Sequence, residues 1–292
     1  MSTDSWSTRM RNDSDANYQE WRDELIGKLN TLSPLLAAET NITVGAGARP
    51  ASNTEQGYAV YRLNDSLHAT APIFLRFGFG TASGAGNPRL QLTTGTSTNG
   101  SGVLGGTAVG LISNIHPANG GGAQTSDVGR QSYACANEGF FGLSFKQGAM
   151  NGSFFIVRTC TALGVPDARG SLAHWGLGTS STINKRQAFR YASPAAAYPA
   201  QTGIARAMLG FIPQLDNTSA IGPDIQAAVG WTRVPETTPL FAVAGILSGE
   251  VNIGNTFSFT PVGSTARTFI TLPNETGGFG PDLTLNTAML WE

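Results

Sequence analysis

The sequence predicts a mostly β protein: a β-sandwich body of jelly-roll-like character, preceded by one N-terminal helix. Glycine occurs 37 times in 292 residues, roughly twice the usual share, and glycine favours turns over element interiors. Charged residues make up only 13% of the chain, against about 25% in typical globular proteins. Short alternating apolar runs are separated by turn residues at intervals of about 8–12 residues, which is typical of sandwiches and barrels.

Residues 17–33 have the periodicity of an amphipathic helix. One face carries residues spaced three or four apart: Tyr18, Trp21, Leu25, Leu29 and Leu32. Asn17 is the predicted N-cap, with Glu20 three residues later as its reciprocal capping partner. Pro34 either ends this helix or begins a second short helix over 34–38.

This apolar stripe is the candidate partner-binding site. Burying one Leu or Trp contributes about 1.5–3 kcal/mol, so the stripe must pack on its own sandwich or on a neighbouring subunit. The preceding residues 1–15 are polar and expected to be loose, and the glycine-bearing segment 43–53 follows. Residues 1–40 are therefore predicted to form an arm, and 41–292 the body.

Alternation predicts the strands of the body. Ile73, Leu75, Phe77 and Phe79 share one face of a strand, and Leu90 and Leu92 continue the pattern after a loop. The almost uncharged segment 93–110 is expected to be a loop or weak strand that makes contacts.

Later segments follow the same logic. Residues 141–145 and 154–157 are predicted to form a hairpin that turns at Gly152, and 161–187 to be irregular. A boundary between two sub-domains is expected near 161–203. Four strands are predicted in the last hundred residues: 225–234, 240–247, 251–260 and 267–272.

Nothing in the sequence predicts catalysis, a cofactor or a metal. His68, His116 and His174 lie far apart, without the spacing of zinc ligands. The glycines of 78–84 do not match a dinucleotide loop, and we interpret them as a turn. A polysaccharide hydrolase remains an alternative, because it needs only two carboxylates about 5–10 Å apart in a cleft. The candidates are Asp167, Asp224, Glu236, Glu250 and Asp282.

Charge and hydropathy exclude several partners. The formal net charge of −1 does not favour binding to nucleic acid or an anionic membrane. We expect no membrane insertion and no secretory signal, because no stretch approaches about 18 uninterrupted apolar residues and residues 1–15 lack an apolar region. Cys135 and Cys160 are either two buried thiols or one bridge.

Three segments resemble virion structural proteins of tailed bacteriophages, of the tail, baseplate, neck or collar type. They are WRDELIGKLNTLSPLLAA (21–38), the glycine-rich stretch 73–102 and the ending 240–273. The resemblance implies a symmetric homo-oligomer, made in the host cytoplasm, that assembles with other virion proteins and needs no cofactor. Alternatives are a receptor- or carbohydrate-binding module, to which Trp175 and Trp231 could contribute stacking surfaces, and a head decoration protein.

Overall fold

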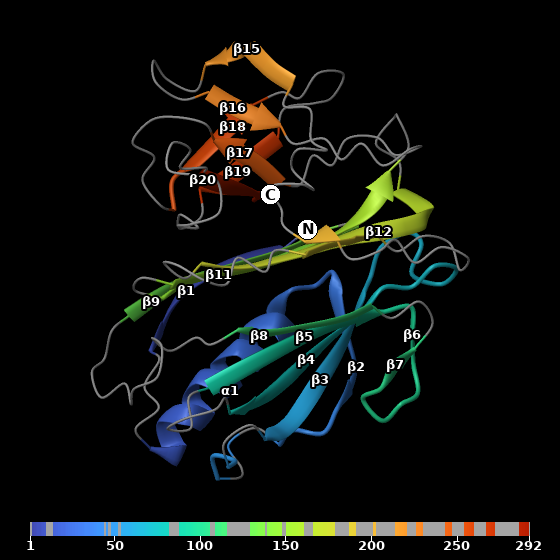
Figure 1. Cartoon of the computed structure of the whole chain (residues 1–292), viewed down its shortest axis with the longest axis vertical. Helices are drawn as coiled ribbons and strands as arrows, with labels where there is room; N and C mark the ends of the chain where they lie inside the picture. The colour runs from blue at the N-terminus through green and yellow to red at the C-terminus, as the bar shows by residue number, and fades with distance from the viewer. Residues whose placement is uncertain are drawn as a thin grey trace. The chain divides into compact units, whose positions relative to one another are not determined.

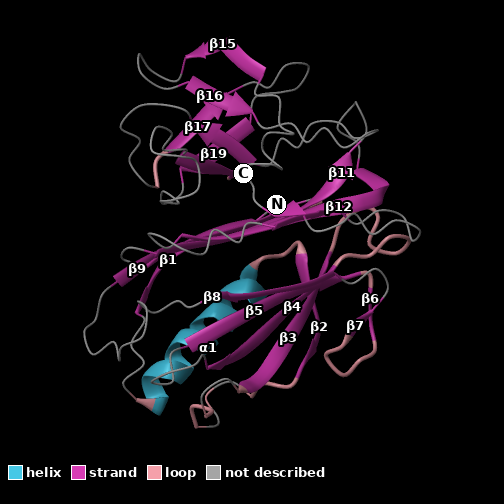
Figure 2. Cartoon of the chain, viewed as in Figure 1, coloured by secondary structure: helices cyan, strands magenta, loops and turns pink. Residues whose placement is uncertain are grey.

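The computed structural model confirms a mostly β chain with antiparallel sheets and an N-terminal helix (Figure 2). The structure describes residues 2–9, 14–43, 45, 48–51, 54–81, 88–105, 109–115, 129–137, 139–147, 150–160, 166–178, 187–190, 201–202, 214–220, 226–229, 243–246, 254–259, 267–271 and 286–291.

The chain divides into two compact units, residues 1–138 with 145–148, and residues 139–144 with 149–292. The first unit contains the helix, the strand on each side of it and the sheet that follows. The arm over 1–40 and the boundary near 161–203 stay predictions.

A five-stranded antiparallel sheet in the order β2-β3-β4-β5-β8 forms the centre of the first unit (Figure 1). Its strands are β2 (Leu35–Thr40), β3 (Glu55–Leu63), β4 (Phe74–Thr81), β5 (Pro88–Gly95) and β8 (Val109–Ile115). Two short strands, β6 (Ser97–Thr98) and β7 (Leu104–Gly105), pair as a hairpin within the connection that leads from β5 to β8.

The helix α1 (Asp15–Thr31) begins two residues earlier than predicted. Its N-cap is Ser14, whose Oγ accepts a hydrogen bond from the backbone N–H of Asn17 at 3.2 Å. The prediction of Asn17 as the cap was wrong, because Ser14 has the extended backbone that a cap requires and offers its hydroxyl to the third helical residue. No second helix follows Pro34, since β2 begins at Leu35.

The helix packs on one face of the five-stranded sheet. Trp21 meets Phe79 edge-on, with ring centroids 6.2 Å apart, and the Tyr18 hydroxyl donates to the Gly80 carbonyl at 3.1 Å. The Tyr61 hydroxyl donates to Asn30 Oδ1 at 3.0 Å, which links the other end of the helix to β3. The core of the first unit therefore lies between α1 and this sheet.

A seven-stranded sheet has the order β1-β9-β10-β11-β12-β13-β14, and a six-stranded sheet the order β15-β16-β17-β20-β19-β18. The strands of the first are β1 (Ser2–Arg9), β9 (Gly129–Asn137), β10 (Phe140–Gln147), β11 (Met150–Cys160), β12 (Pro166–Gly178), β13 (Gln187–Arg190) and β14 (Gln201–Thr202). Those of the second are β15 (Gln214–Ala220), β16 (Gln226–Val229), β17 (Val243–Ile246), β18 (Thr256–Phe259), β19 (Arg267–Thr271) and β20 (Asn286–Leu290).

Several predicted boundaries need correction. The N-terminal residues 2–9 form β1, paired with β9, although their polar sequence predicted a loose segment. Gly152 lies inside β11 opposite Leu177, so it does not turn the predicted hairpin. Residues 166–178 form β12 within a segment predicted to be irregular. In each case pairing with another strand supplies the order that local sequence does not.

The four strands predicted near the C-terminus are confirmed as β16, β17, β18 and β19. Gly254 forms a turn before β18 and has φ of 86°, a left-handed conformation that favours glycine. The sequence did not predict β15 and β20, which join the same sheet.

Candidate functional site

The strand β4 divides its side chains between two different environments. Leu75, Phe77 and Phe79 are buried on the face that carries α1. Arg76 and Gly78 point to the opposite face, because successive side chains of a strand alternate. We call this second surface the hairpin face; it carries Glu39, Glu55, Tyr58, Arg76 and Gly102.

An ion pair forms the centre of the hairpin face. Arg76 Nη1 donates to Glu55 Oε2 at 2.9 Å, and Arg76 Nη2 donates to Glu55 Oε1 at 2.5 Å. This two-point geometry matches the planar guanidinium to the carboxylate. The guanidinium also lies over the Tyr58 ring, 4.9 Å from its centroid, which adds a cation–π contact.

Glycines in β4 leave space for these contacts. A Cβ at Gly78 would collide with the Glu55 carboxylate and the Arg76 guanidinium, and one at Gly80 would collide with the Thr54 carbonyl oxygen. The interpretation of residues 78–84 as a glycine turn was therefore wrong for Gly78 and Gly80. Both lie within a strand, where glycine permits close approach.

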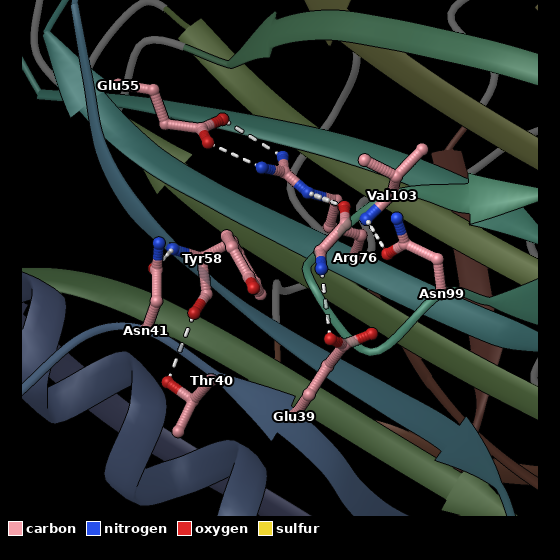
Figure 3. Close-up of polar contacts among 9 residues, drawn as sticks. Glu39, Thr40, Asn41, Glu55, Tyr58, Arg76, Asn99 and Val103 are labelled. Carbon is pink, nitrogen blue, oxygen red and sulfur yellow. Dashed lines mark hydrogen bonds and ion pairs between the residues drawn. The ribbon is translucent and has the colours of Figure 1, made fainter.

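The β6–β7 hairpin is held on this face at Gly102. Arg76 Nε donates to the Gly102 carbonyl at 2.8 Å, and the Gly102 N–H donates to Glu39 Oε2 at 2.9 Å. The hydroxyl of Thr98 donates to the other oxygen of the same carboxylate, Glu39 Oε1. Figure 3 shows Glu39 from β2 and Arg76 from β4 bound to this loop, with Glu55 from β3 bound to Arg76.

Gly102 is required at this contact for two reasons. Its φ of 77° is a conformation that residues with a Cβ rarely adopt. A Cβ there would also overlap the Tyr58 ring. Contact between the loop backbone and the aromatic ring therefore depends on glycine.

The tip of the hairpin is ordered by its own side chains. Asn99 Oδ1 accepts hydrogen bonds from Ser101 N at 2.8 Å and from Val103 N at 3.2 Å. The Gly100 N–H donates to Thr98 Oγ1 at 3.3 Å. Residues 98–103 thus form a tight, internally bonded loop within the segment 93–110, for which a loop or weak strand was predicted.

Two large apolar side chains are exposed in the described part of the chain, Leu36 at 38% and Val103 at 61%. Leu36 lies opposite Arg62 in the β2–β3 register, and Arg62 lies on the same face as Val60 and Tyr58. Val103 follows Gly102 in the anchored hairpin. Both exposed side chains therefore belong to the hairpin face.

The predicted partner-binding stripe lies on the other side of the sheet. Tyr18, Trp21, Leu25, Leu29 and Leu32 are each at most 2% exposed within their own chain. This arrangement corresponds to the intrachain alternative, and it leaves no apolar surface of the stripe for a neighbour while α1 stays on the sheet. Contact with another subunit stays a prediction for a state in which the helix leaves the sheet.

Few of the other candidate residues lie where the structure describes side chains. His68 forms a local turn, with its Nδ1 2.6 Å from the Asp65 carbonyl oxygen. Asp167, His174 and Trp175 lie in β12, whose side chains are not described. The following candidates lie outside the described residues: His116, Asp224, Trp231, Glu236, Glu250 and Asp282. Cys135 is a buried thiol in β9.

The sequence did not single out Glu39, Glu55, Tyr58 or Gly102. One signal was available: Arg76 is a charged residue in an otherwise apolar and glycine-containing strand, which requires a partner across the sheet. The identity of that partner depends on strand register, which the sequence does not supply.

No protein-family model matches the chain, and no curated protein matches it. Among the described residues, no group of histidine, cysteine, aspartate or glutamate side chains has the arrangement of a metal site. Within the same residues, no helix is long and apolar enough to cross a membrane.

Proposed function

We propose that this protein is a non-catalytic structural subunit of a tailed-phage particle, and that copies of it associate through the hairpin face. The resemblance to virion proteins of the tail, baseplate, neck and collar is the reason for proposing a phage particle. The hairpin face is the proposed contact surface between copies. Its exposed Leu36 and Val103 are the observation that carries the proposal.

The charges on this face support a structural role. Glu39 binds the hairpin backbone, and Glu55 and Arg76 bind each other. A carboxylate held this way serves the architecture of the loop. The remaining surface at the tip is uncharged, and Asn99, Gly100 and Ser101 are all exposed. Uncharged polar surface can be buried between subunits without the desolvation cost of an ion.

A rigid loop also favours association. Binding costs less when the contacting groups are already ordered. The hairpin is held by Arg76 and Glu39 at its base and by Asn99 at its tip. The loop that carries Val103 is therefore already ordered before a partner binds.

Sedimentation of the purified full chain over a range of concentrations tests the proposal. We expect an oligomer that Val103→Asp and Leu36→Asp convert towards monomer, because each places a charge in the contact. A matched exposed apolar position away from this face, Ala16→Asp on α1, should leave the oligomer intact. A stable monomer at all concentrations would contradict association through this face.

Binding and hydrolysis assays test the alternatives. Specific retention on a glycan array by a monomeric chain would favour the carbohydrate-binding module. Cleavage of host polysaccharide, lost on replacing Asp167, Asp224 or Glu250 by Ala, would contradict the non-catalytic proposal.

A further inference from the structure

The tip of the hairpin contains an asparagine followed by a glycine, a pair with its own chemistry. The backbone nitrogen of the glycine can attack the side-chain carbonyl carbon of the asparagine, which closes a five-membered succinimide ring. Glycine allows this because it has no Cβ to obstruct the attack. Asn99 and Gly100 are both exposed, and no atom lies within 4 Å of the Cβ position of Gly100.

The structure places two hydrogen-bond donors on the oxygen that would gain charge. Ser101 N and Val103 N donate to Asn99 Oδ1 at 2.8 and 3.2 Å. Attack on the side-chain carbonyl moves negative charge onto this oxygen. Two fixed backbone N–H groups at hydrogen-bond distance are the arrangement that stabilises such an oxyanion.

A proton path leads away from the attacking nitrogen. The Gly100 N–H donates to Thr98 Oγ1 at 3.3 Å, and the Thr98 hydroxyl donates to the Glu39 carboxylate. A carboxylate at the end of such a path can act as a general base through the hydroxyl. Nucleophile, base and oxyanion donors therefore meet in residues 98–103 and Glu39.

We propose that Asn99 is a site of self-modification, at which the chain converts its own asparagine into aspartate and isoaspartate. The bond between Gly100 N and Asn99 Cγ forms while the amide proton passes to Thr98 and the Thr98 proton passes to Glu39. The bond between Cγ and Nδ2 then breaks, and ammonia leaves with the returned proton. Water opens the succinimide at either carbonyl, so the net change is asparagine plus water to acid plus ammonia.

The product changes the hairpin. Either acid adds a negative charge to the tip that Glu39 clamps, and isoaspartate also lengthens the backbone by one methylene. Aspartate keeps an oxygen that can accept the hydrogen bonds from Ser101 N and Val103 N, whereas isoaspartate moves that oxygen away from them. Formation of isoaspartate would therefore loosen the loop that carries Val103 as the protein ages.

Peptide mapping by mass spectrometry tests this on the folded full chain incubated at neutral pH. Conversion of Asn99 should be at least about tenfold faster in the folded chain than in the urea-unfolded chain, because a positioned base and oxyanion donors each contribute about 10²-fold or more. Asn151–Gly152 is the same dipeptide within β11, and it should convert more slowly when folded than when unfolded.

Variants distinguish a loss of the proton path from a change in the conformation of the loop. Glu39→Gln and Thr98→Val should each slow conversion about tenfold, and Thr98→Ser, which keeps the hydroxyl, should restore it. Amide exchange over 97–105 identifies any variant whose loop has opened.

Two results would overturn the proposal. One is a folded-state rate at Asn99 that does not exceed the unfolded-state rate. The other is a rate that Glu39→Gln and Thr98→Val leave unchanged while the hairpin stays protected from exchange.

Discussion

The two faces of the five-stranded sheet use the same strands for different purposes. On the helix face, Phe77 packs edge-on against Tyr61 with centroids 5.6 Å apart, and both are at most 1% exposed. On the hairpin face, Arg76 and Glu55 keep 17% and 30% of their side chains accessible. The helix face therefore contributes most of the stability of the first unit, whereas the contacts of the hairpin face hold one loop in position.

This difference follows from how each kind of contact is stabilised. Apolar burial is non-directional and proportional to area, so many substitutions fill a core to some degree. Ion pairs and backbone hydrogen bonds depend on geometry, and a partly exposed pair contributes little to stability. Damage to the helix face should affect the whole unit, whereas damage to the hairpin face should affect the loop alone.

The largest expected effect comes from the helix face. Phe77→Ala removes a fully buried ring and should lower the free energy of unfolding by about 3–5 kcal/mol. Denaturant unfolding followed by circular dichroism provides the measurement. Leu36→Ala, at an exposed apolar position, should change it by less than about 0.5 kcal/mol. Similar losses from the two variants would remove the distinction between the faces.

Two glycines of the hairpin form a matched pair. Gly100 and Gly102 have nearly the same φ, 78° and 77°, but only Gly102 faces another group, the Tyr58 ring. Alanine at either position carries a left-handed backbone cost of about 1–2 kcal/mol, and Gly102→Ala adds the collision. We expect faster amide exchange across 97–105 in Gly102→Ala than in Gly100→Ala. Equal exchange would show that Tyr58 does not hold the loop.

Alkaline pH should lower the free energy of unfolding through Tyr61, a buried residue of the helix face. Burial raises the pKa of Tyr61 well above its usual value near 10. The unfolded chain then loses the Tyr61 proton at a lower pH than the folded chain, so stability present below pH about 10 falls as pH rises above it. One such group lowers stability by about 1.4 kcal/mol per pH unit in this range.

Tyr61→Phe tests that assignment. The variant loses the hydrogen bond to Asn30, but its stability should depend less on pH above 10 than that of the wild type. Burial also raises the pKa of Tyr133, so some dependence should remain. Parallel curves for the two proteins would mean that Tyr61 does not carry the effect.

The smallest effect is expected at the ion pair. Arg76→Lys keeps the charge but loses the planar fork that binds Glu55, and it should cost about 0.5–1 kcal/mol, less at high salt. Arg49→Lys is the control, since Arg49 meets the more exposed Asp15 at 3.6 Å and the substitution should change stability very little. Thermal unfolding at two salt concentrations compares them. A large, salt-independent loss would place Arg76 in the core.

Sequence alone determined the features that depend on neighbours within a few residues. The spacing of Tyr18, Trp21 and Leu25 predicts one apolar helix face, and the alternation of Leu75, Phe77 and Phe79 predicts one apolar strand face; both are buried as expected. These periods are properties of the backbone, 3.6 residues per helical turn and two per strand repeat.

Only the tertiary structure decided which distant residues meet. Glu39 and Gly102 are 63 positions apart, Tyr18 and Gly80 are 62 apart, and Arg76 and Glu55 are 21 apart. The contact of Tyr18 depends on how α1 docks on the sheet. The contacts of Glu39 and Arg76 depend on strand register, and a shift of one residue would send every side chain of a strand to the other face. The helix face was therefore predictable from local pattern, whereas the hairpin face exists only once the strands have paired.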